Sequence, residues 1–324
     1  MPLKRSVVSR VIASCGALLS SVSAAYSDGP PEWAFPINPP NLAAPKDDGK
    51  LHSLPGSAAK FSFAQLRDFF SPPDWYPDDH PPMPPLVAHG AQPGALACGF
   101  CHLPTGNGRP ENANIAGLPA SYIIQQVLDF KSGARRSSLP DRYPQALMAK
   151  LSVQAATEPG LTEAATYFAS LKPKPVTKVV ETDTIPKIEI SHWILKKSEE
   201  GGTEPIGDRL IEVPDDFGLF DVRDGHVTYT AYVPKGSLAR GEALAKTGGG
   251  KSIACEICHG TGLKGLGPVP PIAGRFPGYL ARQLFDIKSG ARNGEGAALM
   301  KNVTAQLTNE DIVAITAYVA SLEP

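Results

Sequence analysis

The sequence predicts a mainly α-helical protein in which two similar helical domains are joined by an insert with some short β-strands. Sliding the chain against itself by 157 residues aligns residues 98–135 with residues 255–292 without a gap, with 15 identities in 38 positions. Apolar residues recur at helical spacing in both copies, which indicates a duplicated helical unit. A length of 324 residues also exceeds what one typical domain needs.

The composition argues against one class of function and predicts much loop. The chain has 31 basic and 32 acidic residues, so its formal net charge is −1 and it lacks the field of a dedicated nucleic-acid binder. Its 33 prolines and 31 glycines are typical of a chain with many turns. Four of its five cysteines fall in two copies of one short motif.

The N-terminus has the features of a secretory signal peptide. Lys4, Arg5 and Arg10 precede an apolar stretch of small residues at 11–22, and Ala24 suits a cleavage site. An uncleaved anchor is the alternative, but about a dozen apolar residues are too few to span roughly 30 Å of hydrocarbon. We therefore expect cleavage near Ala24 and export to the periplasm, which leaves a net charge near −4 and two pairs of cysteines.

The two cysteine pairs lie in the strings CGFCH at residues 98–102 and CEICH at residues 255–259. C-x-x-C-H is the attachment signature of c-type haem, because the two cysteines form thioethers to the vinyl groups and the histidine binds iron. A redox-active disulfide or a zinc ribbon also uses Cys-x-x-Cys, but neither explains a histidine at the same place in both copies. We predict two covalently bound haem c groups, held by Cys98, Cys101 and His102 and by Cys255, Cys258 and His259.

Methionines are the candidates for the second axial ligand of each iron. Met148 and Met300 follow the two histidines by 46 and 41 residues, and both end an Ala-Leu-Met string. A thioether ligand favours ferrous iron and raises the reduction potential. Most methionines only fill gaps in a core, but two matched methionines in equivalent loops favour ligation. Met83 lies upstream among prolines and is expected to be a loop residue.

Two helices are predicted in each copy. Residues 121–131 and 279–287 are amphipathic, and Gly133 and Gly290 are expected to end them. A second helix near the end of each copy carries one apolar stripe, at Leu161, Ala164, Ala165 and Phe168 and at Ile312, Ile315, Thr316 and Val319. Thr308 is expected to cap the last helix.

The copies differ at their N-terminal ends and are separated by an insert. Residues 237–244 predict a leading helix in the second copy, whereas in the first we expect residues 61–70 to supply it. The insert contains four segments that read as short strands broken by Pro, Gly and Asp, at residues 179–180, 188–195, 210–213 and 227–233.

The order of these motifs resembles the class I cytochromes c, and the small periplasmic diheme members in particular. The resemblance covers about residues 86–171 and 234–322. It implies that each domain wraps three or four helices around a haem, with His102 or His259 proximal and Met148 or Met300 distal. It also implies that a proline carbonyl holds the ligand histidine, a position occupied by Pro271 in the second copy and by Asn114 in the first.

Together, the N-terminal pattern, the repeat and the resemblance predict five segments along the chain. They are a signal peptide (1–24), a proline-rich N-terminal extension (25–85), a first cytochrome c domain (86–171), a connecting insert (172–233) and a second cytochrome c domain (234–324).

The function implied is single-electron transfer between redox partners, with no catalytic residues. Two alternatives are a diheme enzyme, of the peroxidase or sulfur-compound dehydrogenase type, and a haem subunit of a larger dehydrogenase or oxidase complex. An enzyme needs an open axial position on one iron, which two methionine ligands would deny. The partners are expected to be a donor and an acceptor protein, with a membrane-associated respiratory complex among the candidates.

Five histidines lie outside the motifs and are expected to be surface or hydrogen-bonded residues, because nothing pairs them at ligand spacing. They are His52, His80, His89, His192 and His226. The lysines Lys251, Lys264 and Lys301 are too few to name a docking face from the sequence.

Overall fold

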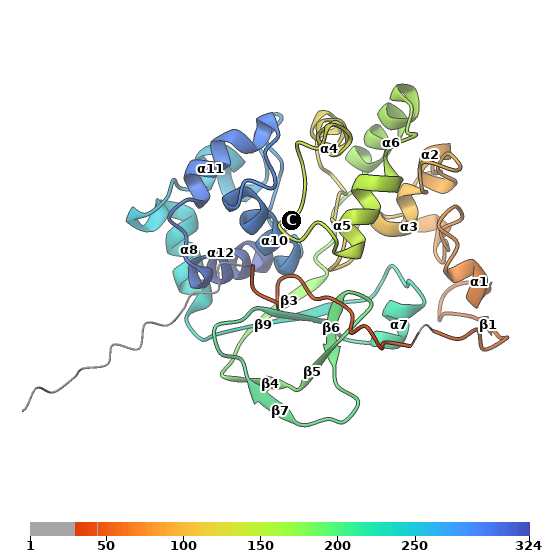
Figure 1. The fold of residues 1–324 in the computed structure, drawn as a ribbon, viewed down its shortest axis with the longest axis horizontal. Helices are drawn as coiled ribbons and strands as arrows, with labels where there is room; N and C mark the ends of the chain where they lie inside the picture. The colour runs from red at the N-terminus through yellow and green to blue at the C-terminus, as the bar shows by residue number, and fades with distance from the viewer. Residues whose placement is uncertain (1–29, 44) are drawn as a thin grey trace, which may run out of the picture.

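The computed structural model describes residues 30–43 and 45–324, and in Figure 1 two groups of helices stand above a layer of strands. The first group contains α2 (Pro85–Ala88), α3 (Cys98–His102), α4 (Ala120–Ser132), α5 (Tyr143–Leu147) and α6 (Glu158–Ser170). The second contains α8 (Ser237–Thr247), α9 (Glu256–His259), α10 (Pro277–Lys288), α11 (Ala298–Thr304) and α12 (Asn309–Ser321). The prediction of a mainly α protein is confirmed.

The predicted signal peptide lies outside the described residues. In the part of the chain that the structure does describe, no helix combines the length and the apolar character needed to cross a bilayer.

Local sequence signals explain where the helices begin and end. Gly133 takes a left-handed conformation (φ 77°) as the C-cap of α4, as predicted. The matching Gly290 (φ 79°) lies one residue beyond the C-cap of α10, which is Ser289. Thr308 caps α12 by accepting a hydrogen bond from Asp311 N, while the Asp311 carboxylate accepts one from Thr308 N. The predicted cap of this helix is therefore confirmed.

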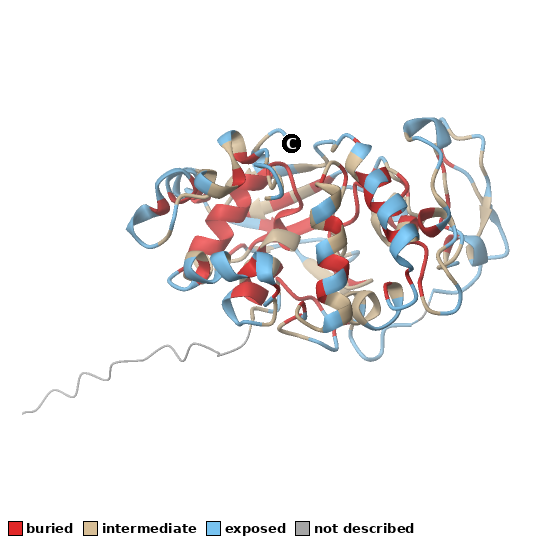
Figure 2. Cartoon of the chain, turned by 90° about the horizontal axis from the view of Figure 1, so that it is seen from above, coloured by how far each residue is buried: buried red, intermediate tan, exposed pale blue. Residues whose placement is uncertain are grey.

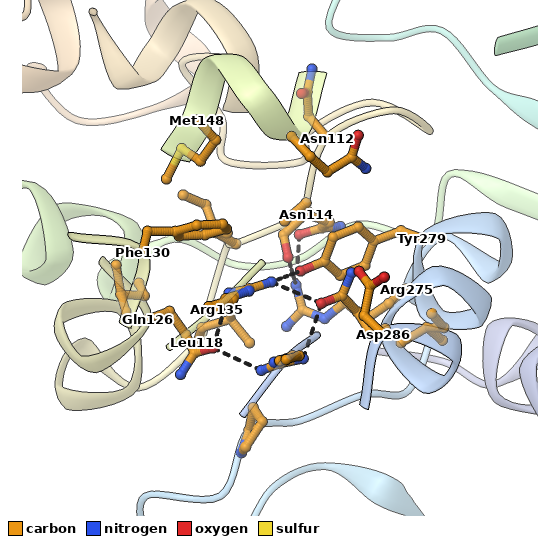
Figure 3. A pocket seen from close by; sticks show the side chains of 18 of the residues that line it. Asn112, Asn114, Leu118, Gln126, Phe130, Arg135, Met148, Arg275, Tyr279 and Asp286 are labelled. Carbon is orange, nitrogen blue, oxygen red and sulfur yellow. Dashed lines mark hydrogen bonds between the residues drawn. The ribbon is translucent and has the colours of Figure 1, made fainter. Parts of the chain in front are cut away.

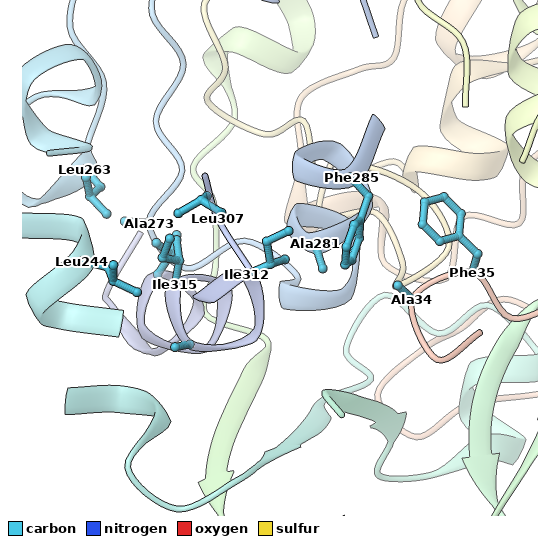
Figure 4. Packing of buried hydrophobic residues seen from close by; sticks show 12 residues of the cluster. Ala34, Phe35, Leu244, Leu263, Ala273, Ala281, Phe285, Leu307, Ile312 and Ile315 are labelled. Carbon is cyan, nitrogen blue, oxygen red and sulfur yellow. The ribbon is translucent and has the colours of Figure 1, made fainter. Parts of the chain in front are cut away.

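Each group of helices buries its predicted apolar stripes in a core of its own. In the second repeat, α8, α10 and α12 meet around Leu244, Ala281 and Ile312 (Figure 4). The approach of α8 to α12 requires glycine, because a Cβ on Gly241 would lie 2.0 Å from Ala314 O. Figure 2 shows the buried residues running along the inward sides of the long helices. This packing makes each helix group a rigid wall for the space between them.

The first repeat does not obtain its leading helix from residues 61–70, so that prediction is wrong. These residues form β2 (Phe61–Ser62), which pairs with β1 (Leu51–His52), and the single turn α1 (Phe63–Leu66). Phe61 packs on Trp75, with ring centroids 4.6 Å apart, whereas Phe69 packs on Phe100 of the first repeat, with centroids 4.5 Å apart. The short α2 packs against α6 instead.

The insert begins and ends on neighbouring strands. The parallel strands β3 (Thr177–Glu181) and β9 (Tyr229–Val233) pair directly, and β8 (Ile211–Pro214) pairs with β9 in the antiparallel sense. Because β3 follows the first repeat and β9 leads into α8, this sheet ties the two repeats together at their base (Figure 1). Its apolar face packs on α12 through Val233, Val313 and Ala317.

The remaining strands form two further pairs in the insert. The predicted strand at residues 188–195 is in fact a hairpin of β5 (Ile188–Ser191) and β6 (Ile194–Lys197). Its two turn residues, His192 and Trp193, have positive φ of 53° and 60°, which the sequence did not signal because neither is Gly, Asn or Asp. The pair β4 (Thr184–Pro186) and β7 (Thr203–Pro205) was not predicted either.

Residues 33–36 pack between other parts of the molecule, and Ala34 and Phe35 are fully buried. Trp33 and Phe35 both pack on Phe285 of α10, with ring centroids 6.2 and 6.3 Å apart. The backbone of the segment accepts a hydrogen bond from Arg142 Nε at Pro36 O (2.9 Å) and one from Arg282 Nη1 at Ala34 O (3.1 Å). The segment therefore contacts both repeats.

Glu212 on β8 is expected to make the protein less stable as the pH rises from about 5 to about 7. Its buried carboxyl accepts hydrogen bonds from Thr177 Oγ1 and Gly278 N, both at 3.2 Å, and burial raises its pKa from 4.5 to about 7. Between these values the folded chain keeps a proton that the unfolded chain has lost. The free energy of unfolding therefore falls with rising pH, by up to about 1.4 kcal/mol per pH unit.

The variant Glu212→Gln tests this expectation, since its amide can accept from Gly278 N and donate to the Thr177 hydroxyl. We expect it to match the natural protein near pH 4.5 and to be more stable by about 1–3 kcal/mol at pH 8. Guanidinium denaturation at several pH values measures both slopes. Glu163→Gln, on the exposed face of α6, is the matched control. A Glu212→Gln protein with the natural pH slope would show that this carboxyl does not titrate on folding.

Candidate functional site

A single cavity of about 1330 Å³ lies between the two groups of helices and brings together every residue proposed to hold a haem. Its lining is mostly apolar, which suits a large planar apolar group. The predicted ligands and attachment residues in its wall are Cys98, Cys101, His102, Met148, Cys255, Cys258, His259 and Met300.

Cys98 and Cys101 lie in the short helix α3, whereas Cys258 lies in α9 and Cys255 is the N-cap of that helix. In α3 the three-residue spacing puts Cys98 and Cys101 on one face, directed to the cavity. Burial raises the pKa of Cys98 to about 12 and that of Cys255 to about 11, which disfavours the thiolate form at these two positions. Within residues 30–43 and 45–324, no three His, Cys, Asp or Glu side chains gather to hold a metal ion.

Both motif histidines are oriented in the same way. Nδ1 of His102 lies 2.8 Å from Ala113 O, and Nδ1 of His259 lies 2.8 Å from Pro270 O. Each bond assigns the proton to Nδ1 and leaves Nε2 free as a ligand, and burial lowers the pKa of both rings, which favours the neutral form that binds metal. The accepting carbonyls come one residue before the expected Asn114 and Pro271, so that expectation is wrong in register although the hydrogen bond exists.

The two methionines line the cavity from different local structures. Met148 begins a π-helical turn, η2 (Met148–Ser152), and packs against Val127 and Val153. Met300 lies within the α-helix α11. Met83 is in an irregular segment packed on the core of the first repeat and does not line the cavity, as expected of a loop residue.

A reciprocal hydrogen-bond network joins the two repeats beside the cavity (Figure 3). Arg135 donates to Gln126 Oε1, Tyr279 OH and Gln283 Oε1, each at 2.9 Å. The equivalent Arg292 donates to Gln283 Oε1, Tyr122 OH and Gln126 Oε1 at 3.1, 2.8 and 2.8 Å. These six residues are three of the repeated pairs, so the duplication places the same side chains on both sides of a pseudo-two-fold interface.

Arg275 adds a positive charge that lacks a full set of protein partners. Its Nη1 donates to Asn114 Oδ1 at 2.6 Å, whereas its buried Nε and Nη2 have no hydrogen-bond acceptor in the described chain. The residue lines the cavity, and burial lowers its pKa to about 10. Such donors fit an anionic group such as the carboxylates of a haem. The sequence contained no signal for Arg275, because its equivalent in the first repeat is Leu118.

The insert supplies one wall of the cavity, on the side of the first motif. His192, Trp193, Asp221 and Arg223 line it, although they were not predicted to lie near the site. His192 Nε2 lies 3.3 Å from Asp221 Oδ1.

Three of the other histidines outside the motifs pair with aspartates, in agreement with their expected structural role. His52 lies 3.4 Å from Asp48, His80 lies 3.2 Å from Asp74, and His226 lies 2.6 Å from Asp79.

Comparison with known proteins places these features in a family. The profile of the cytochrome c family matches residues 238–323. The chain is 27% identical over 239 residues to cytochrome c4 of Azotobacter vinelandii, covering 72% of this chain and 89% of that protein. It is 39% identical over 80 residues to cytochrome c-554(548) of Halomonas halodenitrificans, covering 24% of this chain and 96% of the relative.

A third relative carries a functional name. The chain is 26% identical over 236 residues to a thiosulfate dehydrogenase electron acceptor of Thiomonas intermedia, which covers 71% of this chain and 81% of the relative. Two of these three similarities therefore extend over about seven tenths of this chain.

Proposed function

The chain belongs to the cytochrome c family, with the two-haem pattern of the class I members, and on that premise we propose that it is a diheme electron carrier. It passes single electrons between a donor and an acceptor protein. The observation that supports this most is the gathering of two C-x-x-C-H motifs and two methionines around one cavity. When bound, each haem supplies a one-electron couple of its iron.

His102 with Met148 and His259 with Met300 are the proposed axial pairs. The carbonyls of Ala113 and Pro270 hold the histidine rings, and the mostly apolar lining suits the face of a haem. If both residues of each pair bound its iron, no position would remain open for a substrate, and this arrangement favours a carrier over an enzyme. Relatives named cytochrome c4 and thiosulfate dehydrogenase electron acceptor agree with this role.

The cysteines of both motifs are proposed as covalent attachment points, one haem for each pair. We place the cytochrome c domains at residues 86–171 and 234–324, with residues 172–233 as the insert, and the mature protein in the periplasm. A redox enzyme or a membrane-associated respiratory complex is the proposed class of partner.

Loss of one cysteine pair tests the attachment. Cys98→Ser with Cys101→Ser is expected to leave one haem per chain, as is the matched change at Cys255 and Cys258. Intact mass after denaturation and haem staining of a denaturing gel count the haems. The natural protein is expected to retain two, and retention of two in either variant would contradict the proposal.

A redox titration tests the carrier role. The natural protein is expected to take up two electrons per chain and to keep its oxidised spectrum in micromolar cyanide, because both irons are six-coordinate. Rapid cyanide binding, or turnover with peroxide, would instead indicate an enzyme with an open axial position.

A further inference from the structure

The two repeats differ sharply in how far they expose the surface around their motifs. Three pairs of equivalent positions compare this surface directly. Their exposed fractions are 7% for Leu96 against 45% for Ile253, 2% for Phe100 against 67% for Ile257, and 6% for Arg109 against 59% for Leu266. The backbone motif is the same in both repeats, so the difference comes from what other parts of the chain cover.

Residues from the insert and the N-terminal part cover the first motif. The guanidinium of Arg223 lies 3.5 Å from the centroid of the Phe100 ring, and its Nη1 donates to Phe100 O at 2.7 Å. Phe69 packs on the same ring, with centroids 4.5 Å apart. Arg109 lies 3.7 Å from the ring centroid of Phe220, a residue of α7 (Phe217–Asp221), and donates to its carbonyl oxygen at 3.3 Å.

The insert also reaches the methionine side of the first site. Trp193 at the turn between β5 and β6 stacks on Tyr143 of α5, with ring centroids 4.6 Å apart. The Arg142 side chain donates to Trp193 O from the segment just before α5. The insert therefore contacts the chain on the cysteine side and the methionine side of the first site.

Around the second motif the equivalent surface is open and apolar. Ile257, Leu266 and the 76%-exposed Leu299 project from it, and Ile253 and Leu299 lie at the cavity wall. A hydrogen bond from Ser252 Oγ to Val303 O (2.8 Å) ties the segment of Ile253 to α11, which carries Leu299. We call Ile253, Ile257, Leu266 and Leu299 the open rim.

The charges beside the open rim are mainly positive. Lys264 and Lys301 are exposed, and within the described residues neither makes an ion pair, whereas Lys251 pairs with Asp311 at 2.9 Å. The carboxylate of Glu256 turns back to accept from Gly262 N at 3.1 Å, which leaves Glu295 as the exposed acid of the cavity wall. An acidic partner is thus favoured, and a second copy facing the same surface would bring like charges together.

We propose that redox partners dock on the open rim alone, and that the first haem exchanges electrons with them through the second. The partner is a redox protein with an acidic surface around its own exposed cofactor. This inference rests on the proposed function. An apolar centre with a few charges at its edge suits the small, transient interfaces of electron-transfer complexes.

A flavodoxin, which is a small acidic protein with an exposed flavin edge, serves as the probe. In stopped flow the reduced flavodoxin gives up one electron and a ferric iron of the holoprotein accepts it. At low salt we expect Ile257→Glu and Leu266→Glu to slow this step about tenfold each, with the difference shrinking as salt rises. Leu51→Glu, an equally exposed change on β1, is the matched control and is expected to stay within about twofold.

Carbodiimide cross-linking provides a readout that is independent of electron transfer. We expect carboxylates of flavodoxin to link to Lys264 and Lys301, and not to Lys150, which is exposed beside Met148 of the first site. Cross-links at Lys150, or equal rates for the rim variants and Leu51→Glu, would overturn the proposal. A dimer of the natural protein in analytical ultracentrifugation that dissociates in the rim variants would also overturn the proposal, because a second copy would then occupy the open rim.

Dithionite reduction separates this inference from the proposed function. Dithionite is small and needs no docking surface, so it is expected to reduce both haems in every variant at the natural rate. If the natural protein has two haems that dithionite reduces, normal flavodoxin rates in the rim variants reject only the docking surface. If it lacks two reducible haems, the proposed function itself fails.

Discussion

Met148→Ala and Met300→Ala will each abolish, for one haem, the weak absorption band that reports methionine bound to ferric iron, and the double variant will lose it entirely. The thioether stabilises ferrous iron, so its loss is expected to lower the reduction potential of the affected haem. The shift should be on the order of 100 mV, a fraction of the roughly 0.8 V that axial ligands span. Redox titration monitored by absorbance measures both effects.

The chain contains its own control for this experiment. Met83 does not line the cavity and packs on the core of the first repeat, so Met83→Ala tests the loss of a methionine without the loss of a ligand. It is expected to keep the full band and both potentials. Retention of the full band in Met148→Ala or Met300→Ala would assign that methionine a packing role and require another residue at the iron.

Arg135→Ala is expected to lower the free energy of unfolding by about 3–5 kcal/mol. The buried guanidinium donates three charge-assisted hydrogen bonds, two of them across the interface to Tyr279 and Gln283, and lies 4.6 Å from the centroid of the Phe130 ring. Its removal leaves Tyr279 OH without this donor, and Arg292 becomes the remaining arginine donor to Gln126 Oε1 and Gln283 Oε1. Guanidinium denaturation, followed by haem absorbance and by circular dichroism, measures the change.

Variants of the neighbouring residues sharpen the interpretation. Arg136 is exposed, and its side chain donates one hydrogen bond, to Gly133 O, within the described residues. The free energy of unfolding of Arg136→Ala is expected to stay within about 0.5 kcal/mol of that of the natural protein. Arg135 and Arg292 share Gln126 and Gln283, so their double variant is expected to depart from additivity. Additive, small effects of Arg135 and Arg292 would show that this network does not hold the repeats together.

Local sequence signals predicted the positions of the main helices correctly, but they did not predict which segments pack around the first repeat. The pattern of residues 121–131 and the Thr308 cap are short-range features, and α4 and α12 formed as those features predicted. Residues 61–70 had a helical pattern too, but Phe61 and Leu66 pack in a separate core with Trp75 and Leu54. Periodicity records which face is apolar and does not record what will cover it.

The candidate site also has one part that the sequence predicts and another that only the folded chain shows. Covalent attachment needs two cysteines and a histidine within five residues, so residues 98–102 and 255–259 identify it without any fold. The partners of those residues come from distant segments, and only the folded chain shows that Pro270 O orients His259 or that Arg275 faces the cavity.

By itself, the sequence determined that this protein has two duplicated helical units with a haem-attachment motif in each, because both features are written in contiguous residues. Only the tertiary structure shows that Arg135 and Arg292 donate hydrogen bonds across the two repeats. Only the tertiary structure shows that Arg223 and Trp193 cover the first site, whereas Ile257 of the second site is exposed. The reason is physical: burial and charge pairing depend on which remote segments meet, and the insert meets only one of two nearly identical motifs.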